Sequence, residues 1–173
     1  KLCTYPRTDS RFLTDDLEHS VPELVTVAAA ICEAAAPERV NAKQVCDSRK
    51  VSDHHAILPT ASAGKADTSV LPLGEREILR LVAGQLLRAV SDAHHYAETA
   101  VTLECGGAVF TVKGRTTLTP GWKQYLAQEK QDAALPKLSE GQVLDCAEAA
   151  VKEGKTAPPK HYTEDTLLSA MET

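Results

Sequence analysis

The chain opens with a run whose residue types could handle phosphate, Thr4-Tyr5-Pro6-Arg7-Thr8-Asp9-Ser10-Arg11. A phenol is a poor nucleophile at neutral pH, and a cation two residues on, at Arg7, would favour the phenolate and hold a phosphate oxygen in a fork of donors. The hydroxyl and carboxyl side chains at residues 8–10 are typical of a helix N-cap, whose free N–H groups can face an anion. The run therefore predicts a phosphate-binding turn with a candidate nucleophile, Tyr5, beside it.

This run resembles the active-site motif of type IA DNA topoisomerases, and its proline is most similar to the topoisomerase III branch. Two further stretches resemble the same family, in the family's order: residues 53–60, with the sequence DHHAILPT, and residues 158–168, with the sequence PPKHYTEDTLL. Three matches spread from one end of the chain to the other are far more specific than any one of them. The sequence is therefore identified as a member of this family.

The resemblance implies a mechanism and roles for individual residues. Tyr5 would attack a phosphodiester of single-stranded DNA and keep the 5′-phosphate as a covalent phosphotyrosine while another strand passes through the break. Arg7 would stabilise the phosphate, and His54 would lie near the tyrosine, hydrogen bonded to the phosphate or to Asp9. Because a phosphotyrosine replaces a phosphodiester, the reaction needs no ATP.

Several other side chains have two readings from the sequence. Asp9 is expected to act through hydrogen bonds to Arg7 or the backbone. The hydroxyls of Ser10 and Thr60 could form hydrogen bonds with phosphate or with other parts of the protein. Lys160 and His161 match a position that lies near the DNA path in the family, but they could equally belong to a polar linker. These candidate phosphate- and DNA-binding residues are Ser10, Thr60, Lys160 and His161.

The pair His54-His55 after Asp53 also invites a metal-dependent hydrolase as an alternative. Adjacent histidines on an extended segment point to opposite faces, so they cannot easily share one ion. A catalytic zinc site needs a third protein ligand, and no spacing in the chain nominates one. We therefore expect no metal site in this chain, and a structural histidine remains the simpler alternative for His54.

The composition is that of an ordinary globular protein, with 173 residues, 43% hydrophobic and 25% charged. No apolar run is long enough to span a membrane and no signal-like segment opens the chain. The five cysteines are scattered without a C-x-x-C pair, which argues against a zinc ribbon or a disulfide framework. We expect a cytoplasmic protein without a membrane partner.

The net charge of −5 is unusual for a nucleic-acid binder, whose affinity depends on phosphate contacts. We interpret the chain as a fragment whose basic partner regions lie elsewhere. The resemblance implies that Mg²⁺ is held by an acidic cluster in a separate N-terminal domain, and no such D-x-D cluster occurs here. The fragment is thus expected to carry the nucleophile yet be inactive without that domain. The alternative is a non-catalytic fragment that binds single-stranded DNA or another partner.

The expected fold class is α+β. A capping box that starts at Ser20 predicts a helix over residues 21–36, ended by Pro37. A second helix is expected from Gly74 to near Ser91. Its expected apolar face is Ile78, Leu79, Val82, Leu86 and Val90.

Two β-branched runs joined through Gly106-Gly107, residues 99–103 and 108–112, predict a hairpin. Residues 115–118 would extend its second strand, residues 142–151 are expected to form a third strand, and Thr163 is expected to cap a final helix.

These elements suggest three parts. Residues 1–92 form a helical domain that carries the tyrosine. Residues 93–157 form a small antiparallel β segment, which by resemblance belongs to the family's arch domain. Residues 158–173 form a linker and the start of a further helix. Three strands alone make a marginal sheet, so exposed strand edges are expected.

Overall fold

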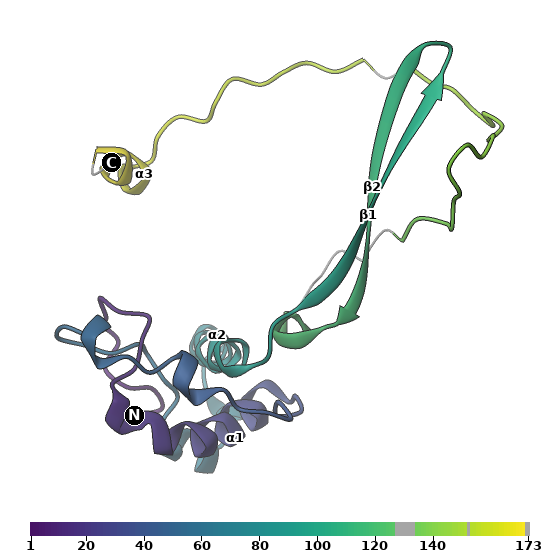
Figure 1. Cartoon of the computed structure of the whole chain (residues 1–173). Helices are drawn as coiled ribbons and strands as arrows, with labels where there is room; N and C mark the ends of the chain where they lie inside the picture. Colours follow the sequence, from purple (N-terminus) through teal and green to yellow (C-terminus); the bar gives the residue numbers. More distant parts are fainter. Residues whose placement is uncertain (127–133, 152, 172–173) are drawn as a thin grey trace. The chain divides into compact units, whose positions relative to one another are not determined.

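The computed structural model describes residues 1–126, 134–151 and 153–171. It divides into two compact units, Lys1–Pro136 and Lys137–Thr173, which are described separately below. Helices and an antiparallel pair of strands together confirm the α+β class (Figure 1). None of the helices in the described ranges combines the length and the apolar character that crossing a lipid bilayer requires.

The first long helix, α1, spans Val21–Cys32. The expected capping box is wrong, because a 3₁₀ turn over Asp15–Ser20 runs directly into the helix. Ser20 already has helical backbone angles, φ −87° and ψ −19°, and its side chain makes no cap hydrogen bond. A capping side chain needs an extended backbone at this position, and the preceding turn removes it.

Helix α1 ends at Cys32, four residues before the predicted end and well before Pro37. Glu33 adopts the left-handed conformation, with φ 52°. Its N–H donates to the Ala30 carbonyl at 3.2 Å, and the Ala34 N–H donates to the Ala29 carbonyl at 3.0 Å. These two bonds form a Schellman motif, which reverses the chain and satisfies the last carbonyls. The left-handed position after a helix is usually occupied by glycine, but here it is a glutamate. The sequence therefore lacks the glycine that would have predicted the end of the helix.

The second long helix, α2, spans Leu73–Val90 and packs against α1, as Figure 1 shows. Its end next to Ser91 agrees with the prediction, but its buried face is rotated from the expected one. Ile78 is 62% exposed, whereas its neighbour Leu79 is only 3% exposed. The buried residues of α2 are Leu79, Ala83, Gly84, Leu86, Leu87 and Val90. Four of them belong to one hydrophobic core cluster, which consists of Leu13, Val21, Val25, Ala28, Ala29, Val45, Leu58, Ala83, Leu86, Leu87 and Val90.

The hairpin is confirmed and is longer than predicted. Strand β1 spans His95–Cys105, strand β2 spans Ala108–Thr119, and they pair antiparallel with Val101 opposite Val112. Gly106 and Gly107 have φ of 57° and 81°, which a two-residue hairpin turn with the twist of the strands requires. Nearly all of the side chains of this two-stranded ribbon are exposed.

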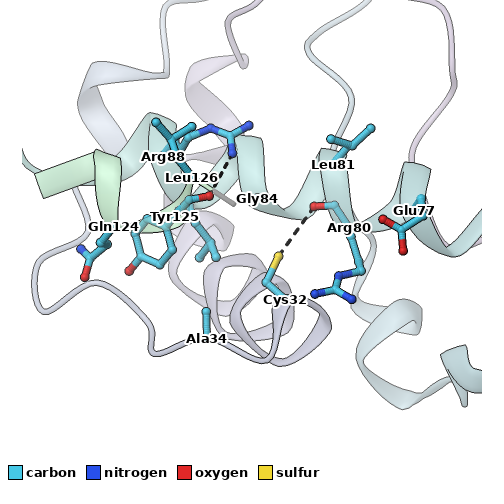
Figure 2. A pocket seen from close by; sticks show the side chains of 11 residues that line it. Cys32, Ala34, Glu77, Arg80, Leu81, Gly84, Arg88, Gln124, Tyr125 and Leu126 are labelled. Atoms are coloured by element: carbon cyan, nitrogen blue, oxygen red, sulfur yellow. Dashed lines mark hydrogen bonds between the residues drawn. The ribbon is translucent and has the colours of Figure 1, made fainter. Parts of the chain in front are cut away.

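The base of the hairpin is fixed to the helical part of the same unit by a 3₁₀ turn, Gly121–Tyr125. The Trp122 N–H donates to the Asp92 carbonyl at 3.0 Å, and the Arg88 guanidinium donates to the Tyr125 carbonyl at 3.2 Å (Figure 2). The Tyr125 hydroxyl donates to the Ala35 carbonyl at 3.0 Å. The side chain that anchors this turn on the core is therefore Tyr125.

In the residues of the second unit that the structure describes, one helix is formed, α3, which spans Glu164–Met171. The predicted cap is confirmed: the Thr166 N–H donates to the Thr163 hydroxyl at 3.2 Å, and the Thr163 N–H donates to the Thr166 hydroxyl at 2.8 Å. The predicted third strand over residues 142–151 is wrong, since this stretch is irregular. A strand needs a partner edge, and no strand exists in the described part of this unit to provide one.

Candidate active site

Two sequence-distant stretches lie antiparallel and hold the start of the chain in place. The Thr4 N–H donates to the Leu58 carbonyl at 2.9 Å, and the Leu58 N–H donates to the Thr4 hydroxyl at 3.0 Å. The Thr60 N–H donates to the Leu2 carbonyl, and the Thr60 hydroxyl donates to the Lys1 carbonyl, both at 2.9 Å. The hydroxyl of the predicted site residue Thr60 is thus hydrogen bonded to a backbone carbonyl in this structure.

Residues 12 and 13, which follow the Tyr5-containing run, are also held by main-chain hydrogen bonds. The Ala56 N–H donates to the Phe12 carbonyl at 2.9 Å, and the Leu13 N–H donates to the Val45 carbonyl at 2.8 Å. The side chain of Leu13 is 2% exposed and belongs to the core. Residues 5–11 therefore form a loop that is held at both ends by main-chain hydrogen bonds.

Within this loop, the expected helix N-cap at residues 8–10 is wrong, because the first helical turn begins only at Asp15. The Ser10 N–H donates to the Thr8 hydroxyl at 3.1 Å, and that hydroxyl donates to the Ser10 carbonyl at 2.7 Å. The Ser10 hydroxyl donates to the Lys50 carbonyl at 2.6 Å. Thr and Ser side chains satisfy the backbone of a turn in this way without a helix.

The loop presents Tyr5 beside His54. The two ring centroids are 5.1 Å apart with an angle of 49° between the ring planes. Tyr5 is 60% exposed, so its hydroxyl is open to an incoming substrate. The structure thus brings together the candidate nucleophile and the histidine that the sequence resemblance named.

A polar hollow of about 490 Å³ adjoins this pair and is lined by Arg7, Thr8, Asp9, Asp53 and His54. Arg7 forms neither a hydrogen bond nor an ion pair with any residue of the described ranges. Its guanidinium therefore has all of its donors available for an anion. The hollow offers one guanidinium and one imidazole, together with two carboxyl groups, next to an exposed phenol; the guanidinium can hold a phosphate oxygen.

Asp9 has a partner that sequence reasoning missed. It accepts a hydrogen bond from the Ser52 hydroxyl, and this bond is the largest cause that holds the pKa of Asp9 below its usual value. Backbone amides and the nearby His54 lower the pKa further. The hydrogen bond expected from Arg7 is not formed in the described part of the chain, where Ser52 is the side chain that donates to Asp9. Ser52 comes directly before the DHHAILPT stretch, and a hydroxyl at that position was its only signal in the sequence.

Cations gather around the loop although the whole chain is acidic. The Lys50 ammonium lies 4.2 Å from the centroid of the Phe12 ring, and the Arg11 guanidinium lies 5.8 Å from it. Lys50 also forms an ion pair with Asp47 at 3.3 Å. For an anionic ligand, positive charge close to the candidate site matters more than the net charge of the chain.

The remaining candidates have other positions. Lys160 and His161 lie in the irregular stretch before α3 in the second unit, and both side chains are exposed. His55 contacts the carbonyl oxygen of Ala56 through its Nδ1 at 2.6 Å. Within the described ranges, no group of three or more His, Cys, Asp or Glu side chains could hold a metal ion.

A family model described as DNA topoisomerase matches residues 1–173. The chain belongs to the DNA topoisomerase family. It is 36% identical to DNA topoisomerase 3 of Bacillus licheniformis, over 99% of this chain and 25% of the relative. It is 37% identical to the DNA topoisomerases 3 of Bacillus subtilis and Vibrio cholerae, over 99% of this chain and 25% and 28% of those relatives.

The assignment from three short stretches is therefore confirmed, including the similarity to topoisomerases 3. This topoisomerase-family chain spans about a quarter of the length of the curated relatives that it matches.

Proposed function

We propose that Tyr5 is the nucleophile of a type IA topoisomerase and that it cleaves and reseals single-stranded DNA to relax or decatenate DNA. The observation that carries this proposal is the exposed phenol next to His54 and to a hollow that holds the unpaired Arg7. The membership in the topoisomerase family supports the same chemistry.

In the proposed step the Tyr5 oxygen attacks phosphorus and its proton leaves to solvent. The bond between phosphorus and the 3′ oxygen breaks, and that oxygen takes up a proton to become a hydroxyl. The reverse reaction reseals the strand, so a phosphodiester is conserved throughout and ATP is not consumed. Arg7 neutralises charge that develops on the non-bridging oxygens, and His54 holds one of them by a hydrogen bond.

The side chains present do not fit a magnesium site. Asp9 and Asp53 line the same hollow, but no set of three suitable ligands exists in the described ranges. Mg²⁺ prefers an oxygen-rich octahedral set, so we place the Mg²⁺ of the parent enzyme in its N-terminal domain and derive no step through it here. That domain is the proposed partner within the same polypeptide, and the chain alone is proposed to be inactive without it. The parent enzyme would act in the cytoplasm.

The deciding experiment mixes the 173-residue chain with a separately made Mg²⁺-binding domain of a topoisomerase 3 and with labelled single-stranded DNA. We expect a protein–DNA adduct that survives denaturant, that needs both parts and that disappears in Tyr5→Phe. Tyr162→Phe is the matched control, since Tyr162 is also exposed, at 69%. An adduct that persists in Tyr5→Phe would contradict the proposed nucleophile.

A second candidate function rests on the unpaired Arg7 guanidinium, which can bind a phosphate whether or not Tyr5 reacts. In that case the chain only binds single-stranded DNA or another partner. The same experiment separates the two: DNA that is retained under native conditions and fully released by denaturant, with both parts and Mg²⁺ present, would identify a binding module. Arg7→Ala should then weaken retention, because its guanidinium is available for phosphate.

A further inference from the structure

A second hollow, of about 390 Å³, lies between the tyrosine loop, residues 56–58 and helix α2. Its walls are mostly aliphatic. They include the core residues Leu13, Val45, Leu58 and Leu86, together with Ala56 and Val82. Polar atoms are confined to a few side chains, which is typical of a pocket that takes a flat organic group and orients it by its edge.

This hollow shares one lining residue with the polar hollow of the candidate active site. Thr8 lines both the polar hollow that contains Arg7 and the aliphatic hollow. The only charged residue on the aliphatic hollow is Arg11, and no carboxylate lines it. A polyanion whose phosphate lies at Arg7 thus meets no repulsion from the lining of this second hollow.

Besides the Thr8 and Ser10 hydroxyls, the polar groups of the hollow belong to Gln85 and Arg11, and both of these side chains can donate hydrogen bonds. Gln85 accepts a bond from the Arg88 guanidinium through Oε1 at 2.9 Å, which leaves its amide NH₂ to donate. Arg11 offers guanidinium donors only. Both side chains therefore suit an edge that is rich in acceptor atoms, such as the ring nitrogens and carbonyl oxygens of a nucleobase.

We propose that this hollow is a subsite for one unstacked nucleobase of single-stranded DNA, next to the phosphate that Tyr5 attacks. The inference rests on the proposed function. The aliphatic walls take up the faces of the base, Gln85 and Arg11 bind its edge, and Thr8 marks the border between base and phosphate. Bases that are splayed out of a single strand are recognised through their faces and edges in this manner.

The test labels the methyl groups of the full chain and follows them by NMR while single-stranded DNA is added. We expect the signals of Ala56, Leu58 and Leu86 to shift with a normal oligonucleotide and to stay in place with an abasic one, which keeps the sugar–phosphate backbone. The imidazole C–H signals of His54, recorded on the same samples, should respond to both oligonucleotides. Methyl shifts that are absent, or equal with the two oligonucleotides, would overturn the subsite.

Matched variants test the edge contacts. Gln85→Glu and Gln124→Glu change the net charge equally, and Gln124 lines the separate hollow drawn in Figure 2. We expect Gln85→Glu to weaken binding of the oligonucleotide at least about fivefold and Gln124→Glu to leave it within about twofold, where tenfold corresponds to 1.4 kcal/mol. Equal losses in both variants would show a general charge effect and overturn the subsite.

The two proposals can fail independently. An adduct on Tyr5 without selective methyl shifts would keep the proposed function and remove the base subsite. Selective methyl shifts without any adduct would instead keep a base-binding hollow in a chain that does not cleave DNA.

Discussion

Replacement of Gly121 by alanine tests how the hairpin is attached to the helical part. Gly121 has φ 52°, which costs an L-residue about 1–2 kcal/mol. An added Cβ would also lie 2.6 Å from the Asp92 carbonyl oxygen and still closer to the Ala93 carbonyl. The backbone must shift, and the bond from the Trp122 N–H to Asp92 is lost, which adds about 1 kcal/mol. We expect the free energy of unfolding to fall by about 2–3 kcal/mol in total.

Gly106→Ala is the control, because Gly106 has nearly the same φ, 57°, yet nothing lies within 4 Å of its added Cβ. It should cost only the backbone term, about 1–2 kcal/mol. Both variants are compared by urea unfolding, with circular dichroism and with the fluorescence of Trp122, the only tryptophan of the chain. Equal losses in the two variants would refute the reasoning, since the close approach of residues 92 and 93 would then have no energetic effect.

Two further predictions concern the site. Ser52→Ala should raise the pKa of Asp9 towards its usual value, as NMR titration would measure. Because the folded-state pKa is depressed, Asp9 stabilises the fold above its unfolded pKa, and this contribution disappears as the pH falls through the folded pKa; the variant should show a weaker acid dependence of unfolding. Thr4→Val should cost about 1–3 kcal/mol in urea unfolding, because the Leu58 N–H loses its acceptor, and Thr4→Ser should restore most of it. An unchanged free energy of unfolding in Thr4→Val would contradict the role of the bond from the Leu58 N–H to Thr4. An unchanged pKa of Asp9 in Ser52→Ala would contradict the role of the bond from Ser52 to Asp9.

The features that depend on local sequence were the predictable ones. A glycine pair fixes the hairpin turn through its positive φ, and Thr163 caps α3 through its own hydroxyl. The face of α2 was not predictable in the same way, because Ile78 and Leu79 are neighbours that both fit a helical period. Packing against α1 decides between them, and that is a tertiary effect.

The candidate site shows the same division. The proximity of Tyr5 and His54 followed from the resemblance to a family, whereas nothing in the spacing of residues implies it. Ser52 was missed because a hydroxyl bonded to a distant carboxylate has no sequence pattern. The aliphatic hollow was missed because residues from 8 to 89 in the chain contribute to it.

The loop over residues 5–11 is flanked by main-chain hydrogen bonds, and these determine which of its side chains can be replaced without displacing the loop. The bonds that join Thr4 to residue 58 and Phe12 to residue 56, at the two ends of the loop, run between backbone atoms, so they do not depend on which side chains residues 5 and 7 carry. The chemistry of the loop can therefore be exchanged while its place in the fold is kept. A fluorinated tyrosine at position 5, more acidic than tyrosine itself, would report how the reactivity of the phenol alone sets the rate of strand cleavage.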